Sequence, residues 1–162
     1  MSRIRILQTR IAALLLADPE AWFGDDQGRA PVLKDHTAEN GGEVIDNLID
    51  ASLAKLGLAV TVALPTATLV RKRHWKYQVR IFLEENELFN RDAAAGGTGR
   101  SADEFAERIA ELLDGKGNGL TANPRGSTLG LLIPGDPTIS DQPNPAGDNL
   151  LLQVLFTTEF SA

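Results

Sequence analysis

The sequence predicts an α+β fold, a two-layer sandwich in which helices pack on one face of a mainly antiparallel sheet of about four or five strands. Three observations lead to this prediction. Apolar residues recur at helical spacing in three segments, they alternate at strand spacing in others, and turn-forming residues separate these segments. We expect residues 1–162 to form a single domain, because a chain of 162 residues is long enough to bury one sizeable core.

The three expected helices are recognised by their apolar faces and by residues typical of helix ends. The first helix carries, at helical spacing, Ile4, Leu7, Ile11, Leu14 and Leu15. The second covers 43–56 and stops at Gly57, a residue common at helix C-termini. The third begins at Ser101 with Glu104 three residues later, which is the pattern of a capping box, and ends before Gly115. We expect these apolar faces to pack on the sheet and not on a membrane.

The expected strands alternate apolar and more polar residues, and turn residues bound them. They are 58–64, 77–83, 129–133 and 149–160, with a short edge strand near 31–33. Irregular loops are expected near 22–42, 115–127 and 134–148, where glycine, proline and polar residues gather. These loops belong to the one domain and do not link it to a second.

Composition narrows the classes of function. The chain has no cysteine, which excludes disulfides and thiolate metal sites and makes a cytoplasmic setting the natural expectation. A formal net charge of −6 argues against broad, charge-driven binding to nucleic acid, although a local basic patch remains able to act. No segment has the length of uncharged apolar sequence that a membrane span needs, and Arg10 interrupts the apolar start in a way that is unlike a signal peptide.

A strand that leads into ENELFNR (85–91), followed by a short glycine loop and SADEFAERIAELL (101–113), resembles proteins of phage tail assembly, in particular small tail-terminator or tail-completion subunits. The resemblance covers roughly 58–113, and 150–160 more loosely. It implies a structural subunit that forms a homo-oligomeric ring at the end of a tail tube. The expected partners are other tail proteins, and the expected location is the cytoplasm during assembly and then the virion tail. No catalytic residue is carried over from this resemblance.

A basic cluster at 71–76 is the strongest concentration of charge in the chain. We expect it to form the end of a hairpin and to pair with acidic groups such as Glu84, Glu85 and Glu87 of a neighbouring subunit. A grip on nucleic-acid phosphates is the alternative, with an aromatic ring inside the cluster to stack on a base. The candidate interface residues there are Arg71, Lys72, Arg73 and Trp75. Trp75 would anchor an interface if it is exposed, whereas a buried tryptophan in the adjacent strand is the ordinary case.

Three further interface candidates, Asn86, Asn90 and Arg91, lie in the resembling segment. Two interpretations of them are open. The asparagines can shape the exit from the strand by satisfying backbone groups of the turn. Arg91 can pair with Glu84, Glu85 or Glu87 in its own loop, or with acidic residues of a neighbouring subunit.

The glycine loop 96–101 invites comparison with a phosphate-binding loop, because it opens a helix. The details differ, since Arg100 stands where a Walker motif has lysine and Ala94 stands where that motif has glycine. A small nucleotide- or nucleic-acid-binding domain that uses this loop or the 71–76 cluster is therefore the alternative function.

Catalytic and metal-binding patterns are weak, and we expect no enzyme and no cofactor. His36 and His74 are far apart and belong to no metal-binding spacing. The acidic residues that lie nearest one another in the first third of the chain lack the regular positions of a calcium loop, namely Asp25, Asp26, Asp35 and Glu39. A Gly-x-Ser-x-Gly nucleophile motif is missing from the sequence. The sequence thus predicts no catalytic, cofactor-binding or metal-binding residue.

Overall fold

The computed structural model describes residues 2–24, 30–72, 74–113, 131–134, 137–144, 147 and 149–161. Its helices are α1 (Arg3–Leu16), α2 (Ile45–Leu56), α3 (Glu87–Asn90), the short 3-10 helix η1 (Ala93–Ala95) and α4 (Ala102–Leu113). Its strands are β1 (Val32–Lys34), β2 (Leu58–Val62), β3 (Thr66–Arg71), β4 (His74–Glu85), β5 (Leu131–Pro134), β6 (Thr138–Asp141) and β7 (Leu150–Ser161).

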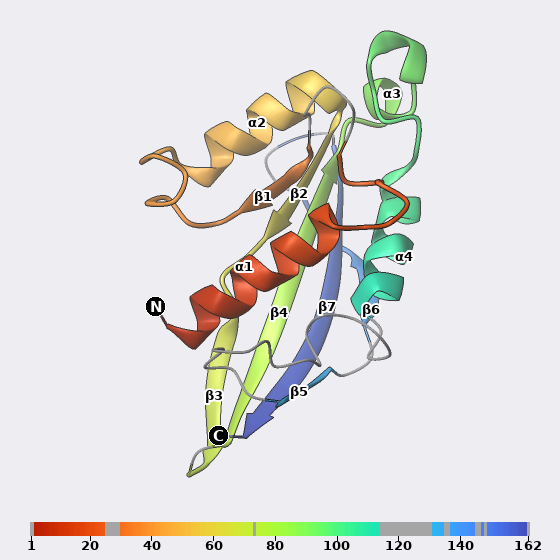
Figure 1. Ribbon diagram of the computed structural model, residues 1–162. Coiled ribbons are helices and arrows are strands. Elements are labelled where there is room, and N and C mark those ends of the chain that lie inside the picture. The colour runs from red at the N-terminus through yellow and green to blue at the C-terminus, as the bar shows by residue number, and fades with distance from the viewer. Residues whose placement is uncertain are drawn as a thin grey trace.

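These strands form one sheet in the order β1-β2-β4-β7-β5, with β3 paired to β4 and β6 paired to β7 (Figure 1). The pairing of β1 with β2 is parallel, and the other pairings are antiparallel. The α+β class with a mainly antiparallel sheet is therefore confirmed. The sheet has seven strands in place of the four or five predicted. The two additional strands are β3 and β6, and β6 lies inside the range 134–148 that was predicted to be a loop.

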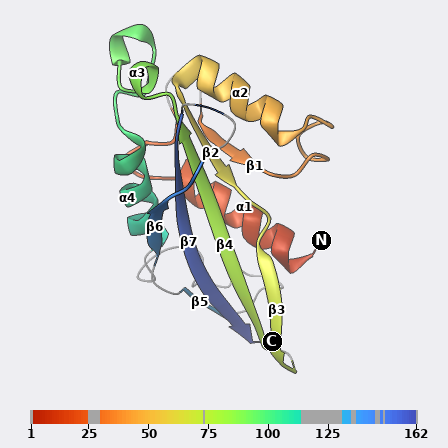
Figure 2. The ribbon, with the colours of Figure 1, turned by 180° about the vertical axis from the view of Figure 1, so that it is seen from behind.

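The core lies between one face of the sheet and the two helices α1 and α4. Alternate residues of β4 point into it, from Tyr77 to Leu83, which is the period of a half-buried strand. The helices add Leu7, Ile11, Leu15, Phe105 and Ile109, all of them fully buried. Helix α1 lies in front of the strands in Figure 1 and behind them in Figure 2.

Helix α2 packs on the opposite face. The sequence placed the helices on one face, where α1 and α4 lie, whereas Ile45 and Ile49 of α2 line a pocket together with Phe82 and Leu151. Phe82 alternates with the inward residues Ile81 and Leu83, so its side chain points away from the core. The chain turns at Gly57, in the left-handed conformation with φ +73°, and enters β2 at the next residue.

The far end of the sheet extends beyond the helices. There β3 pairs with the first half of β4, and β7 continues alongside β4 to the same end (Figures 1 and 2). Leu69 and Val70 are more than half exposed, at 54% and 56%. We call the described residues 69–72 and 74–76 the hairpin end.

A buried ion pair joins the turn after α1 to α4. Arg108 donates from Nε to Oδ2 of Asp18 at 3.0 Å, and its second guanidinium nitrogen donates to Oδ1. The carboxylate of Asp18 is fully buried, whereas Glu20 and Glu111, which also approach Arg108, are mostly exposed. The hydrogen bond from Arg108 lowers the pKa of Asp18 below its ordinary value near 3.8.

The pKa of Asp18 is lower in the folded chain than in the unfolded chain. The ion pair therefore stabilises the fold above pH 4, and this stabilisation is lost as the pH falls through the pKa of the folded chain.

We expect Asp18→Asn to lower the free energy of unfolding by about 2 to 3 kcal/mol at pH 7. This loss is smaller than that expected for a fully enclosed ion pair, because Glu20 and Glu111 remain near Arg108 in the variant. Urea denaturation of wild type and variant at pH 7 and pH 3 measures the difference. The difference should shrink at pH 3, and Glu20→Gln is the matched control that should show little change at either pH. An equal difference at both pH values would contradict the prediction.

Candidate functional site

The segment 85–91 begins at a buried carboxylate. Glu85 is the last residue of β4, points to the core side, and is fully buried. One of its oxygens accepts hydrogen bonds from the backbone N–H of Ala102 at 2.9 Å and from the side-chain amide of Asn90. The other oxygen accepts from the guanidinium of Arg91 at 3.0 Å. Glu85 therefore holds together the end of β4, the turn after it and the start of α4.

Asn90 is the second buried polar residue of this network. Its side-chain amide also donates to the backbone carbonyl of Arg100 at 2.6 Å, and its side-chain oxygen accepts from the hydroxyl of Thr98. Asn86 has a simpler role, since its side-chain oxygen caps α3 by accepting from the N–H of Phe89 at 3.3 Å. Both asparagines thus perform the local role, and buried Asn90 is not available to a neighbouring subunit.

Arg91 pairs within its own chain. Its guanidinium lies 3.0 Å from Glu85 and 3.8 Å from Glu87, and the hydrogen bond with Glu85 raises the pKa of Arg91. The side chain remains 45% exposed. Glu84 lies on the other face, where it accepts hydrogen bonds from Asn144 and Asn149. The predicted contact of the basic cluster with Glu85 of a neighbour is therefore wrong, because burial and the bonds from its own chain make Glu85 inaccessible.

Two glycines allow the backbone of Asn90 to pass between them. A Cβ on Gly97 would overlap the carbonyl oxygen of Phe89 and lie 2.6 Å from that of Asn90. A Cβ on Gly57 would lie 2.7 Å from the Cα of Asn90. Real Cβ contacts are not this short, so both positions require glycine. Close packing of loop against loop explains the glycine at position 97.

The start of α4 is already occupied by carboxylates of the protein. The backbone N–H of Ser101 donates to Glu104 at 2.7 Å, and the N–H of Glu104 donates to the hydroxyl of Ser101 at 3.2 Å. This confirms the predicted capping box. With Ala102 bonded to Glu85, three of the first backbone donors have partners. The geometry therefore gives no support to a phosphate at this loop.

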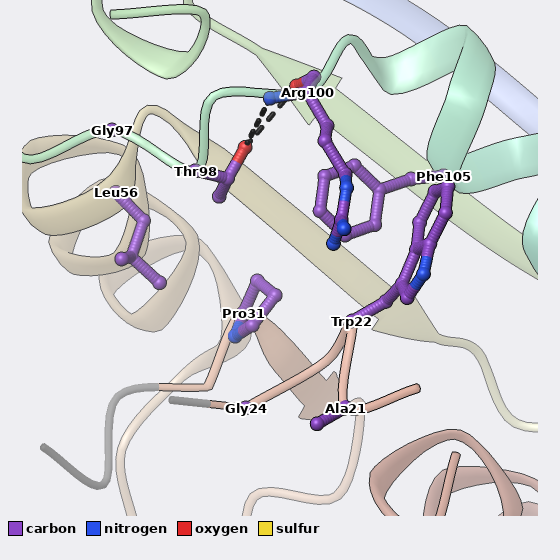
Figure 3. Close-up of a pocket in the computed structure, with 9 residues that line it drawn as sticks. All are labelled: Ala21, Trp22, Gly24, Pro31, Leu56, Gly97, Thr98, Arg100 and Phe105. Carbon is purple, nitrogen blue, oxygen red and sulfur yellow. Dashed lines mark hydrogen bonds between the residues drawn. The ribbon is translucent and has the colours of Figure 1, made fainter. Parts of the chain in front are cut away.

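A pocket of about 180 Å³ lies beside the glycine loop (Figure 3). Gly97, Thr98 and Arg100 line one side of it, and Trp22 and Phe105 line another. The guanidinium carbon of Arg100 lies 4.0 Å from the centre of the Trp22 ring, a cation–π contact, and Trp22 meets Phe105 edge to face. The hydroxyl of Thr98 is engaged with Asn90 and with the backbone of Arg100. These contacts stabilise the loop, and sequence reasoning missed the contribution of Trp22.

The 71–76 cluster lies where β3 turns into β4, which is the predicted hairpin end. Arg71 and Lys72 are exposed, and Arg71 pairs with His74 in the strand ladder. Trp75 is partly buried and packs against the core, where it lines a pocket with Ala67 and the start of α1. It is therefore not an exposed anchor. Arg73 lies outside the described residues.

The remaining candidates do not converge on a site. In the part of the chain that the structure describes, no group of three or more acidic, histidine or cysteine side chains is placed to hold a metal ion. His36 lies 3.3 Å from Glu39, which also pairs with Lys34, whereas His74 is on the hairpin end. Asp25 and Asp26 fall outside the described ranges, as does the predicted loop 115–127. Of the helices described, none is long and apolar enough to cross a membrane.

The fold and these surfaces define an α+β protein with a polar junction and an extended hairpin. No protein-family model matches the chain, and no curated protein matches it.

Proposed function

We propose that this chain is a structural subunit of a phage or prophage tail, which assembles as a homo-oligomeric ring at the end of the tail tube as tail-terminator and tail-completion proteins do. The observation that carries the proposal is the hairpin end. It extends beyond the helices and exposes both apolar and basic side chains, Leu69, Val70, Arg71 and Lys72. Exposed apolar side chains next to charges are typical of a surface that meets another protein.

The polar network around Glu85 supports the same proposal. Its residues bond to one another and to backbone groups, and they bring the end of β4 and the start of α4 together. Such a network joins these segments through buried hydrogen bonds. In this proposal the protein acts through its surfaces, with other tail proteins as partners and the virion tail as its final location.

The absolute mass in solution tests the proposal. We expect the mass, measured by light scattering after size exclusion, to rise with protein concentration to one closed multiple of 17.4 kDa, visible as a ring in negative stain. Val70→Asp should shift the association to concentrations at least tenfold higher, because it places a charge in the contact. Leu88→Asp is the matched control, since Leu88 is 90% exposed but lies on α3. A monomer at every concentration, both alone and with isolated tail tubes, would refute the proposal.

The second candidate is binding of nucleic acid through the 71–76 cluster. It is favoured by the exposure of Arg71 and Lys72 at one end of the molecule. Binding to a short duplex and to a single strand should then weaken steeply with salt and fall in the variant with Arg71, Lys72 and Arg73 changed to alanine. Ring formation needs no nucleic acid, so the two candidates are separated by measuring mass and binding on the same samples.

A further inference from the structure

An apolar groove lies on the sheet face opposite the core, between α2 and the strands β2, β4 and β7. Its volume is about 260 Å³, and its apolar walls are Ile45, Ile49, Phe82 and Leu151. Two carboxylates, Asp35 and Glu84, line the same groove. The groove therefore combines apolar walls with negative charge. Figure 2 shows α2 at this end of the sheet, away from the hairpin end.

The groove exists because α2 is only partly seated on the sheet. The residues that α2 buries are Ser52 and Leu56, in its second half, and Ser52 donates from its hydroxyl to the carbonyl of Leu58. In its first half, Ile45 and Ile49 stay partly exposed, and Val44 just before the helix is 51% exposed. The apolar face of this half has room for a further side chain.

The hairpin end has the complementary chemistry. It presents two apolar side chains, Leu69 and Val70, followed directly by Arg71 and Lys72. It cannot enter the groove of its own chain. The part of β4 from Trp75, at the hairpin end, to Glu84, at the groove, spans about 30 Å as an extended strand. The hairpin end of a second copy is free of this restraint and has the chemistry that fits the groove.

We propose that the hairpin end of one copy docks in the groove of the next copy. Val70 enters between α2 and the sheet, and Arg71 and Lys72 meet Asp35 and Glu84. The two surfaces are different and lie at opposite ends of the sheet, so the contact is heterologous, and such contacts generate a ring when the rotation closes and a filament when it does not. The inference rests on the proposed ring and names its interface.

Because the chain has no cysteine, a disulfide introduced between copies reports the contact directly. The variants Val70→Cys and Ile49→Cys are prepared separately, one of them with a mass tag, and mixed under mild oxidation. A disulfide needs its two Cα atoms within about 7 Å of each other. Positions 70 and 49 lie too far apart within one chain, so a link between them reports a contact between two copies. We expect a cross-linked species of mixed mass from this pair. Val70→Cys mixed with Glu107→Cys, at an exposed position on α4, is the matched control and should give much less.

A charge swap tests the same contact without introduced cysteines, which could disturb packing. Arg71→Glu should weaken association about tenfold or more, and adding Asp35→Arg in the same chain should restore it, because the swapped charges attract again. If the wild-type protein forms a ring but V70C links I49C no better than E107C, the groove contact is refuted while the ring proposal stands. If the wild-type protein stays monomeric, both alone and with isolated tail tubes, and no link forms, both are refuted. Failure of the charge swap to restore association would also contradict the docking.

Discussion

Replacing Glu85 with alanine is expected to lower the free energy of unfolding by about 3 to 5 kcal/mol. The carboxylate is fully buried and accepts hydrogen bonds from Asn90, Arg91 and the backbone of Ala102. Its removal leaves the Asn90 amide with one acceptor fewer and the N–H of Ala102 without its partner, at a depth that water does not reach. Two loops and the first turn of α4 then lose their common attachment.

Urea denaturation followed by circular dichroism measures this loss. With a slope of about 2 kcal/mol per molar urea, the midpoint should fall by roughly 1.5 to 2.5 M. Glu87→Ala is the matched control, because Glu87 is exposed, lies two residues away and stands 3.8 Å from Arg91. Its effect should stay within about 0.5 kcal/mol. A loss for Glu85→Ala no larger than that for Glu87→Ala would contradict the prediction.

Replacing Gly97 with alanine is expected to destabilise the fold by about 3 kcal/mol or more. The added methyl group meets backbone atoms, the carbonyl oxygens of Phe89 and Asn90, and backbone cannot rotate away as a side chain can. Because Asn90 also bonds to Glu85, Thr98 and Arg100, a shift of its backbone weakens the whole network. The expected cost therefore exceeds that of a single overpacked methyl group.

The measurement is the same denaturation experiment, with Gly24→Ala as the control. A Cβ on Gly24 meets no atom within 4 Å, and neither Gly24 nor Gly97 has a positive φ, so the two substitutions differ in contact and not in backbone strain. Gly24→Ala should be neutral or slightly stabilising. A neutral Gly97→Ala would mean that the two loops do not approach as closely as described.

The substitutions at Glu85 and Gly97 are expected to affect assembly only by destabilising the folded protein. The junction around Glu85 joins the start of α4 to the end of β4, whereas the groove and the hairpin end lie at opposite ends of the sheet. Substitutions in the junction should abolish assembly only together with the fold, whereas substitutions at Val70 or Asp35 should reduce assembly in a folded protein. A comparison of denaturation with mass for the two groups separates the residues that build the scaffold from those proposed to build the interface.

Much of the candidate site could be expected from the sequence, because local patterns determine it. The alternation that places Tyr77, Val79, Ile81 and Leu83 inside also places position 85 inside, although a glutamate there was not expected to be buried. The capping box of α4 and the cap by Asn86 depend on residues three positions apart, so they too are local. The strands that were missed, β3 and β6, have mostly exposed residues and so lack a strong apolar alternation.

The sequence by itself determined the helices α1, α2 and α4, the main strands and the basic hairpin end, since each follows from periodicity or composition within a short window. Only the tertiary structure decided which face α2 covers, that Asp18 meets Arg108 ninety residues later, and that Gly57 and Gly97 enclose Asn90. These features depend on contacts between segments distant in sequence. No local sequence pattern predicts these contacts, because they form only when the sheet brings those segments together.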